Sequence, residues 1–163
     1  MERLWSPWRL KYVSSTGRPC ACVFCEAQEH AGADSLVVYR GRTAFVILNL
    51  FPYNSGHLLV VPNRHIATLA SASREELGEM MDLTRVSEQA LTEVYAPQGL
   101  NVGMNLGRSA GAGIVDHIHV HIVPRWNGDT NFMTVVGETR VLPEDITQTA
   151  QRLRETFARL AQP

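Results

Sequence analysis

The alternation of histidine with branched apolar residues in His117-Ile-His-Val-His121 constrains the fold of this chain more than any other feature. In a β-strand, side chains two residues apart lie on the same face, about 6.6 Å from each other. His117, His119 and His121 therefore share one face, and the apolar residues between them point to a core on the other. We predict a strand over residues 115–123, in a sheet with one imidazole-lined face and one buried face.

Three imidazoles on one surface suit phosphoryl or nucleotidyl transfer, because imidazole titrates near neutrality and serves both as a nucleophile and as a proton carrier. Two other interpretations stay open. The three histidines could bind a metal ion, since residues i and i+2 of a strand can share one metal. They could also form no more than the polar face of a strand.

Four more segments are rich in apolar residues typical of strands, and short polar or glycine-containing turns bound them. Gly41-Arg42 separates the first two segments and predicts a hairpin. Hairpin-length connections favour antiparallel pairing. The predicted strands cover residues 35–40, 43–50, 57–61 and 99–106.

Two helices complete the predicted fold. Ser73 and Glu76 form a capping-box signature for a helix that runs to about Tyr95. Pro143 opens a second helix, with apolar residues at helical spacing over residues 143–162. We therefore predict an α+β fold in which a five-stranded antiparallel sheet is accompanied by two main helices.

Length and composition fit one globular domain over residues 1–163, with an irregular cysteine-containing segment at 1–33. Hydrophobic residues make up 45% and charged residues 19%, a balance that argues against disorder. The net charge of −1 does not predict nucleic-acid binding, and no apolar run is long enough for a membrane span. The three cysteines lie within six residues, which suits a reducing, cytoplasmic setting better than a disulfide framework.

A small, glycine-rich loop over residues 105–113 comes directly before the histidine strand. Glycine lets successive backbone N–H groups turn toward an anion and approach it closely. The loop lacks the Lys-Ser/Thr pair of a P-loop, so no Walker site is implied. Its position predicts a phosphate-binding loop, although a plain strand connection would also use glycine.

Cys22-Val-Phe-Cys25 has the spacing of two thiolates in a tetrahedral zinc site. Such a site needs two more ligands, which His65 and one of the strand histidines could supply. Buried free cysteines are the alternative interpretation. We expect Cys20 to take no part in the site.

Together these motifs resemble the histidine triad (HIT) superfamily, and within it the bacterial branch related to diadenosine tetraphosphate phosphorylases and Fhit-like dinucleoside polyphosphate hydrolases. The resemblance extends over residues 5–132. It implies a HIT-like fold, a homodimer and a purine nucleotide substrate. The matching segments are the histidine run continued by Ile122-Val123, Trp5-Ser-Pro-Trp-Arg9, Cys22-x-Phe-Cys25, Asn54-Ser-Gly-His-Leu-Leu-Val60 and Val123-Pro-Arg-Trp126.

The resemblance also implies roles for individual residues. His119 would attack the α-phosphorus, while His57 and His121 would contact phosphate oxygens. A structural zinc ion would be bound by Cys22, Cys25, His65 and His117. Contacts to the ribose and the phosphates would come from Asn49, Asn105, Ser109, Gly111, Gly113 and His121.

The chain departs from the family pattern at Gly113 and Ile114, where many relatives have Gln followed by Ser or Thr. A side-chain donor to the leaving phosphate is therefore missing. The predicted activity is cleavage of dinucleoside polyphosphates, with diadenosine tetraphosphate foremost, through a nucleotidyl-histidine. The acceptor would be water or another group. A phosphorylase that uses phosphate as acceptor and a non-catalytic, zinc-stabilised nucleotide-binding or sensing module are the alternatives.

Overall fold

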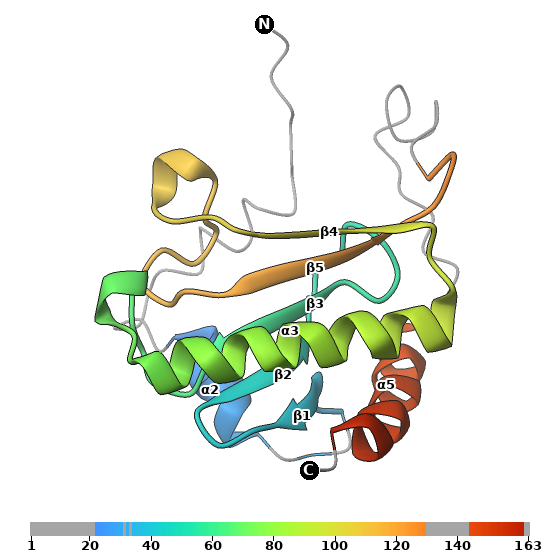
Figure 1. The fold of residues 1–163 in the computed structure, drawn as a ribbon, viewed down its shortest axis with the longest axis horizontal. Coiled ribbons are helices and arrows are strands. Elements are labelled where there is room, and N and C mark those ends of the chain that lie inside the picture. Colours follow the sequence, from blue (N-terminus) through green and yellow to red (C-terminus); the bar gives the residue numbers. More distant parts are fainter. Residues whose placement is uncertain (1–21, 31, 33, 130–143, 162–163) are drawn as a thin grey trace, which may run out of the picture.

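A five-stranded antiparallel sheet forms the centre of the fold in the computed structural model, which describes residues 22–30, 32, 34–129 and 144–161 (Figure 1). The strand order is β1-β2-β3-β5-β4, so β1 and β4 are the edge strands. Every neighbouring pair is antiparallel, which confirms the predicted sheet. The strands are β1 (Val37–Arg40), β2 (Ala44–Leu48), β3 (Leu58–Pro62), β4 (Gly99–Met104) and β5 (Val120–Arg125).

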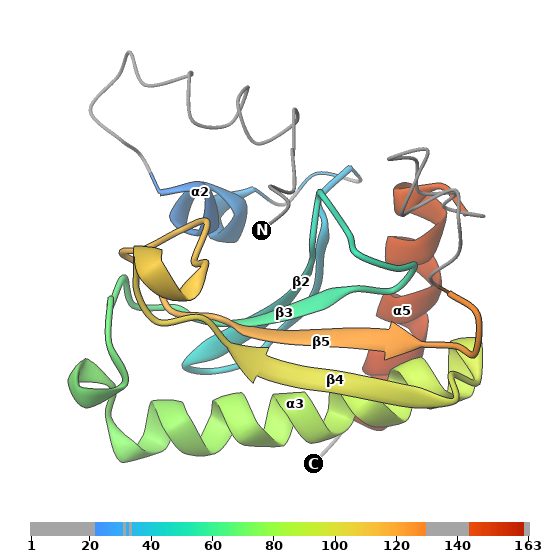
Figure 2. The ribbon, with the colours of Figure 1, turned by 90° about the horizontal axis from the view of Figure 1, so that it is seen from above.

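Helices cover both faces of the sheet (Figure 2). On one face lie the two predicted helices, α3 (Arg74–Tyr95) and α5 (Ile146–Leu160), and a shorter helix, α2 (Val23–Glu29), lies on the other. Strands β2 and β3 are buried along their whole length, because alternate residues pack into the core on each face. These strands therefore read as continuous apolar runs in the sequence.

The predicted capping box fixes the start of α3. The Ser73 side chain accepts from the Glu76 N–H, and the Glu76 carboxylate accepts from the Ser73 N–H. Arg64, just after β3, also donates to this carboxylate through two nitrogens. The guanidinium of Arg64 lowers the pKa of Glu76. The segment that follows β3 is thus attached to the first turn of α3.

The structure differs from the sequence prediction in two places. The last strand, β5, covers Val120–Arg125 instead of residues 115–123, so His117 and His119 precede it. In addition, α2 forms inside the segment expected to be irregular. The Trp5–Arg9 motif and Cys20 lie outside the described residues. Within the part of the chain that is described, no helix has the length and apolarity that crossing a bilayer requires.

Candidate active site and metal cluster

His119 has one ring nitrogen fixed by the backbone. Its Nδ1 lies 2.9 Å from the carbonyl oxygen of His117, and because a carbonyl can only accept, the Nδ1–H is the donor. The lone pair of the neutral ring is therefore on Nε2. Burial lowers the pKa of His119, which keeps the ring unprotonated at neutral pH. This tautomer has its free, nucleophilic nitrogen at the far end of the ring.

A chain of hydrogen bonds sets the tautomer of His121. The Tyr53 N–H donates to Nδ1 of His57 over 3.1 Å, so the proton of a neutral His57 is on Nε2. That Nε2 lies 3.0 Å from Nδ1 of His121, which must then accept. His121 consequently carries its own proton on Nε2, where it can donate to a ligand. Burial, together with the charge of His119, lowers the pKa of His121 to about 4.

His117 belongs to a different cluster. Its Nε2–H donates to the Pro62 carbonyl over 2.8 Å, so Nδ1 carries the lone pair. This nitrogen lies 3.3 Å from Sγ of Cys22 and 3.8 Å from Sγ of Cys25. Cys25 Sγ is in turn 3.5 Å from Nδ1 of His65. The ligand atoms of these four residues all lie within 4.8 Å of one another.

This cluster fits zinc. Tetrahedral zinc with ordinary bond lengths places a sulfur and a nitrogen ligand about 3.6 Å apart, close to the spacing of the sulfur and nitrogen atoms here. The hydrogen bond to Pro62 holds the His117 ring with its lone pair toward the thiols. Burial raises the pKa of the Cys25 thiol, and the charge on Cys22 raises it further. A bound divalent cation would counteract this shift, because it stabilises the thiolate form.

The same geometry argues against a metal bound by the three histidines of the run. Nδ1 of His117 faces the cysteines, whereas Nδ1 of His121 accepts from His57. The rings of His119 and His121, by contrast, are neighbours, with centroids 4.8 Å apart. The run is therefore divided between two places, with His117 in the cysteine–histidine cluster and the other two histidines at a cavity.

That cavity has a volume of about 420 Å³ and is lined by both His119 and His121. Its lining includes residues of α2, the end of β2 and the residues after β2. Apolar side chains dominate, and a few polar groups gather near the histidines, a combination typical of small-molecule sites. The apolar lining includes Phe24, Ala27, Leu36, Ile47, Leu59 and Ile114.

The predicted substrate-binding residues fall into two groups. Asn49, Asn105, Gly111 and Gly113 line the cavity with the two histidines, whereas Ser109 does not. Asn49 is also engaged with the protein, because its amide contacts Nδ1 of His57 and accepts from the Phe51 N–H. His57 is fully buried, does not line this cavity and has its Nε2 hydrogen-bonded to Nδ1 of His121. Its expected contact with phosphate stays a prediction.

Sequence reasoning missed two aromatic residues at the site. Phe24 packs between the clusters, with its ring centroid 5.4 Å from His117 and 5.0 Å from His119. Tyr53 contacts both His57 and His121 and lines the cavity. Phe24 lies inside the Cys-x-x-Cys motif, which indicates metal binding but does not indicate an aromatic contact with the histidines. Tyr53 follows Pro52 in a loop, where no sequence pattern marked it.

An antiparallel α+β sheet that carries such a histidine run beside a nucleotide-sized cavity defines a histidine triad protein. Residues 30–128 match the HIT domain family. The chain therefore belongs to the HIT family.

Named relatives agree with this assignment. The chain is 39% identical to the AP-4-A phosphorylase of Mycobacterium tuberculosis, over 98% of this chain and 86% of the relative. It is 35% identical to the asymmetrical bis(5′-nucleosyl)-tetraphosphatase of Schizosaccharomyces pombe, over 58% of this chain and 52% of that protein. Among solved structures, a zinc-bound histidine triad family protein from Mycobacterium smegmatis superposes with a TM-score of 0.69, at 29% identity, covering 86% of this chain and 96% of that one.

Proposed function

We propose that this protein cleaves dinucleoside polyphosphates, with diadenosine tetraphosphate as the main substrate, through a nucleotidyl intermediate on His119. The observation that carries the proposal is the pair of tautomers at the cavity. The lone pair of His119 is on Nε2, and His121 beside it keeps an Nε2–H to donate. A nucleophile next to a fixed donor is the arrangement that displacement at phosphorus requires.

In the first step, Nε2 of His119 attacks the α-phosphorus while the bond from that phosphorus to the bridging oxygen breaks. ATP leaves, and adenylate stays bound to the histidine. His121 donates to oxygens that gain negative charge. Asn105 and the glycines at 111 and 113 line the same part of the cavity and hold the phosphate.

In the second step, an acceptor oxygen attacks the same phosphorus and the bond to His119 breaks. Water gives AMP, and inorganic phosphate gives ADP. We favour phosphate for two reasons. The chain resembles an AP-4-A phosphorylase over nearly its whole length. In addition, a Cβ added at Gly113 would meet no atom within 4 Å, so this side of the cavity has room for a second phosphate.

The ratio of ADP to AMP tests the acceptor. We expect ADP, and not AMP, to be the main product released alongside ATP when inorganic phosphate is raised to millimolar levels at a fixed concentration of diadenosine tetraphosphate. A ratio that stays near zero would exclude phosphorolysis and leave hydrolysis. A protein that binds the dinucleotide without any turnover would be the sensing module instead.

The proposal includes a structural zinc ion bound by Cys22, Cys25, His65 and His117. Zinc would supply no chemistry to the reaction but would hold α2 against the segments that carry the two histidines. The ring of Phe24 contacts both His117 and His119, so an ordered α2 would also hold the ring of the nucleophile in place. We also propose a cytoplasmic location, because two thiols placed to bind a metal ion suit a reducing compartment.

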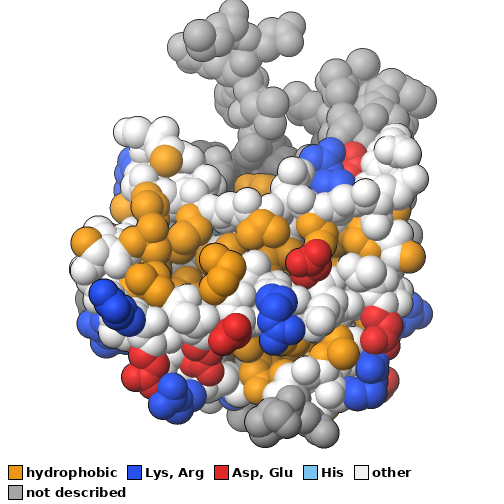
Figure 3. Space-filling view, viewed as in Figure 1, with side chains coloured by type: hydrophobic (Ala, Val, Ile, Leu, Met, Phe, Trp, Pro, Cys, Tyr) orange, Lys and Arg blue, Asp and Glu red, His pale blue; other side chains and the backbone are white. Residues whose placement is uncertain are grey.

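We further propose that the protein is a homodimer paired through β4. This strand lies at the edge of the sheet, and exposed hydrophobic side chains gather on the neighbouring surface over α3 (Figure 3). Val102 on β4 is 53% exposed and Met81 on α3 is 68% exposed. Light scattering should give twice the chain mass, and Val102→Asp should give a monomer. Leu69→Asp, at an exposed apolar residue elsewhere, is the matched control.

A further inference from the structure

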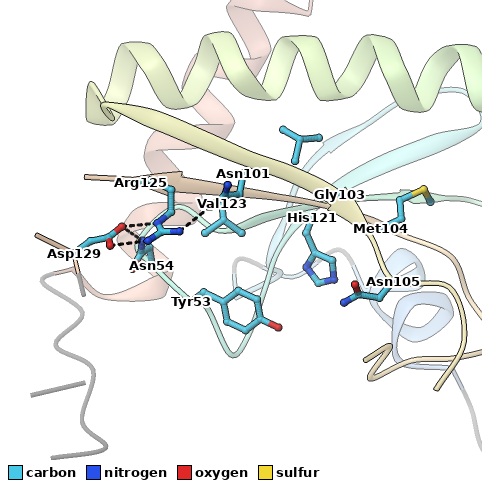
Figure 4. A pocket seen from close by; sticks show the side chains of 11 residues that line it. Tyr53, Asn54, Asn101, Gly103, Met104, Asn105, His121, Val123, Arg125 and Asp129 are labelled. Atoms are coloured by element: carbon cyan, nitrogen blue, oxygen red, sulfur yellow. Dashed lines mark hydrogen bonds and ion pairs between the residues drawn. The ribbon is translucent and has the colours of Figure 1, made fainter. Parts of the chain in front are cut away.

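A second cavity of about 470 Å³ adjoins the first at His121 (Figure 4). It runs along β4 and β5 from Asn105 and His121 at one end to Arg125 and Asp129 at the other. The two cavities share three lining residues, which are Tyr53, Asn105 and His121. A ligand that occupies both must therefore pass these three residues, one of which is His121, the proposed donor to the reacting phosphate.

The two cavities differ in character. The first is mainly apolar, whereas asparagine amides and an ion pair line the second. Its far end is a flat, well-fixed surface: Arg125 donates through Nε and Nη2 to the Asp129 carboxylate, and through Nη1 to Oδ1 of Asn101. Asp129 also accepts from the Asn54 amide, and these contacts lower its pKa. The ion pair is internally neutralised, so it does not form a site for a polyanion.

A guanidinium held in one plane is a surface on which a nucleobase stacks. Arg125 is in this state, and its side chain is 44% exposed. The adjacent Asn101 amide uses its oxygen for Arg125, and no described group accepts from its nitrogen. An amide of this kind pairs well with the polar edge of a purine. The second cavity thus suits a nucleoside better than it suits free phosphates.

We propose that the second cavity binds the distal nucleoside of the substrate, the one that leaves as part of the nucleoside triphosphate. This inference rests on the proposed function. The first nucleoside occupies the apolar cavity beside His119, the phosphate chain crosses His121, and the second base stacks on Arg125. The site therefore recognises a nucleotide with a nucleoside at both ends.

Gly103 allows a direct test. It lines the second cavity, lies opposite His121 in the β4–β5 register, and an added Cβ would meet no atom within 4 Å. Gly103→Val therefore fills the cavity without disturbing the packed core. Gly78 on α3 is the control, because an added Cβ there also meets no atom within 4 Å and this residue does not line the cavity. Light scattering checks that Gly103→Val, which lies on the proposed dimer edge, keeps the wild-type mass.

The experiment compares diadenosine tetraphosphate with adenosine 5′-tetraphosphate, which has four phosphates but no second nucleoside. Calorimetric binding is measured with His119→Ala protein, so that neither ligand is consumed. The dinucleotide should bind about tenfold more tightly, a gain typical of one stacked base. Adding Gly103→Val should remove this difference, and adding Gly78→Val should preserve it.

Equal affinity for the two ligands in the His119→Ala protein would overturn the proposal. An equal loss for both ligands with Gly103→Val would overturn it as well, since that result would mean interference with His121. The proposed function is judged separately by turnover of the two ligands by the wild-type protein. Turnover of both without a difference in binding would refute the second subsite alone.

Discussion

Nε2 of His57 lies 3.0 Å from Nδ1 of His121, and this bond joins a fully buried histidine to one that lines both cavities. The direction of the bond follows from the Tyr53 N–H, which occupies the other nitrogen of His57. We therefore propose that His57 acts through His121, by fixing which nitrogen of His121 carries the proton.

His57→Ala should lower kcat by about 10²-fold, as expected when a reacting group loses its fixed orientation. KM should change little, because His57 lines neither cavity. His57→Gln, whose amide can still donate to His121, should recover part of the rate. A His57→Ala protein that folds and turns over at the wild-type rate would show that His121 needs no such support.

Stability should depend on pH through His121. Burial lowers its pKa from 6.5 to about 4, so the unfolded chain binds more protons than the folded one between these values. The contribution of this group to the free energy of unfolding is greatest above pH 6.5 and decreases as the pH falls toward 4. His121→Asn keeps an acceptor for His57 but does not titrate. The melting temperature of this variant should fall less than that of wild type between pH 7 and pH 5, and equal slopes would contradict the assignment.

Loss of one zinc ligand should affect metal content and stability together. Chelator-washed wild-type protein should hold about one zinc per chain, and Cys22→Ser should lower both zinc content and melting temperature, because a structural metal contributes to folding. Cys20→Ser, outside the proposed ligand set, is the control. Elemental analysis that finds no zinc in protein grown with added zinc would refute the site.

The sequence was sufficient for much of this account, because the strongest patterns are local. The capping box at Ser73 is a contact within four residues, and the cysteine spacing places two thiols about one helical turn apart. The continuous apolar runs of β2 and β3 mark strands that are buried on both faces. The alternation in the histidine run also predicted the core side correctly, since Ile118 and Ile122 pack under α3.

What the sequence could not give depends on contacts between distant segments. The division of the histidine run arises because the Ile118 N–H bonds to the Ile66 carbonyl outside the sheet, and β5 begins only at Val120. The proposed role of His57 depends on the Tyr53 backbone and on a hydrogen bond to His121, 64 residues away in the sequence. Neither relationship has a periodic signature.

Ile114 lines the cavity beside His119, at the position where the family resemblance predicts a hydroxyl that would donate to the leaving phosphate. Diadenosine tetraphosphate has a good leaving group and should be cleaved much faster than an adenosine phosphoramidate. Ile114→Ser should raise phosphoramidate cleavage by about 10²-fold, the usual value of one well-placed donor. Ile114→Val provides a control that keeps the apolar side chain. Faster cleavage of the phosphoramidate than of the tetraphosphate by wild type would contradict this explanation.

The covalent intermediate on His119 is the central claim, and trapping tests it most directly. Wild-type protein quenched during turnover of labelled diadenosine tetraphosphate should carry an acid-labile, base-stable adenylyl group, and peptide mapping should locate it on His119. His119→Ala should carry no label and show no turnover, yet still bind nucleotide. Label on another residue, or turnover by His119→Ala at the wild-type rate, would contradict the account.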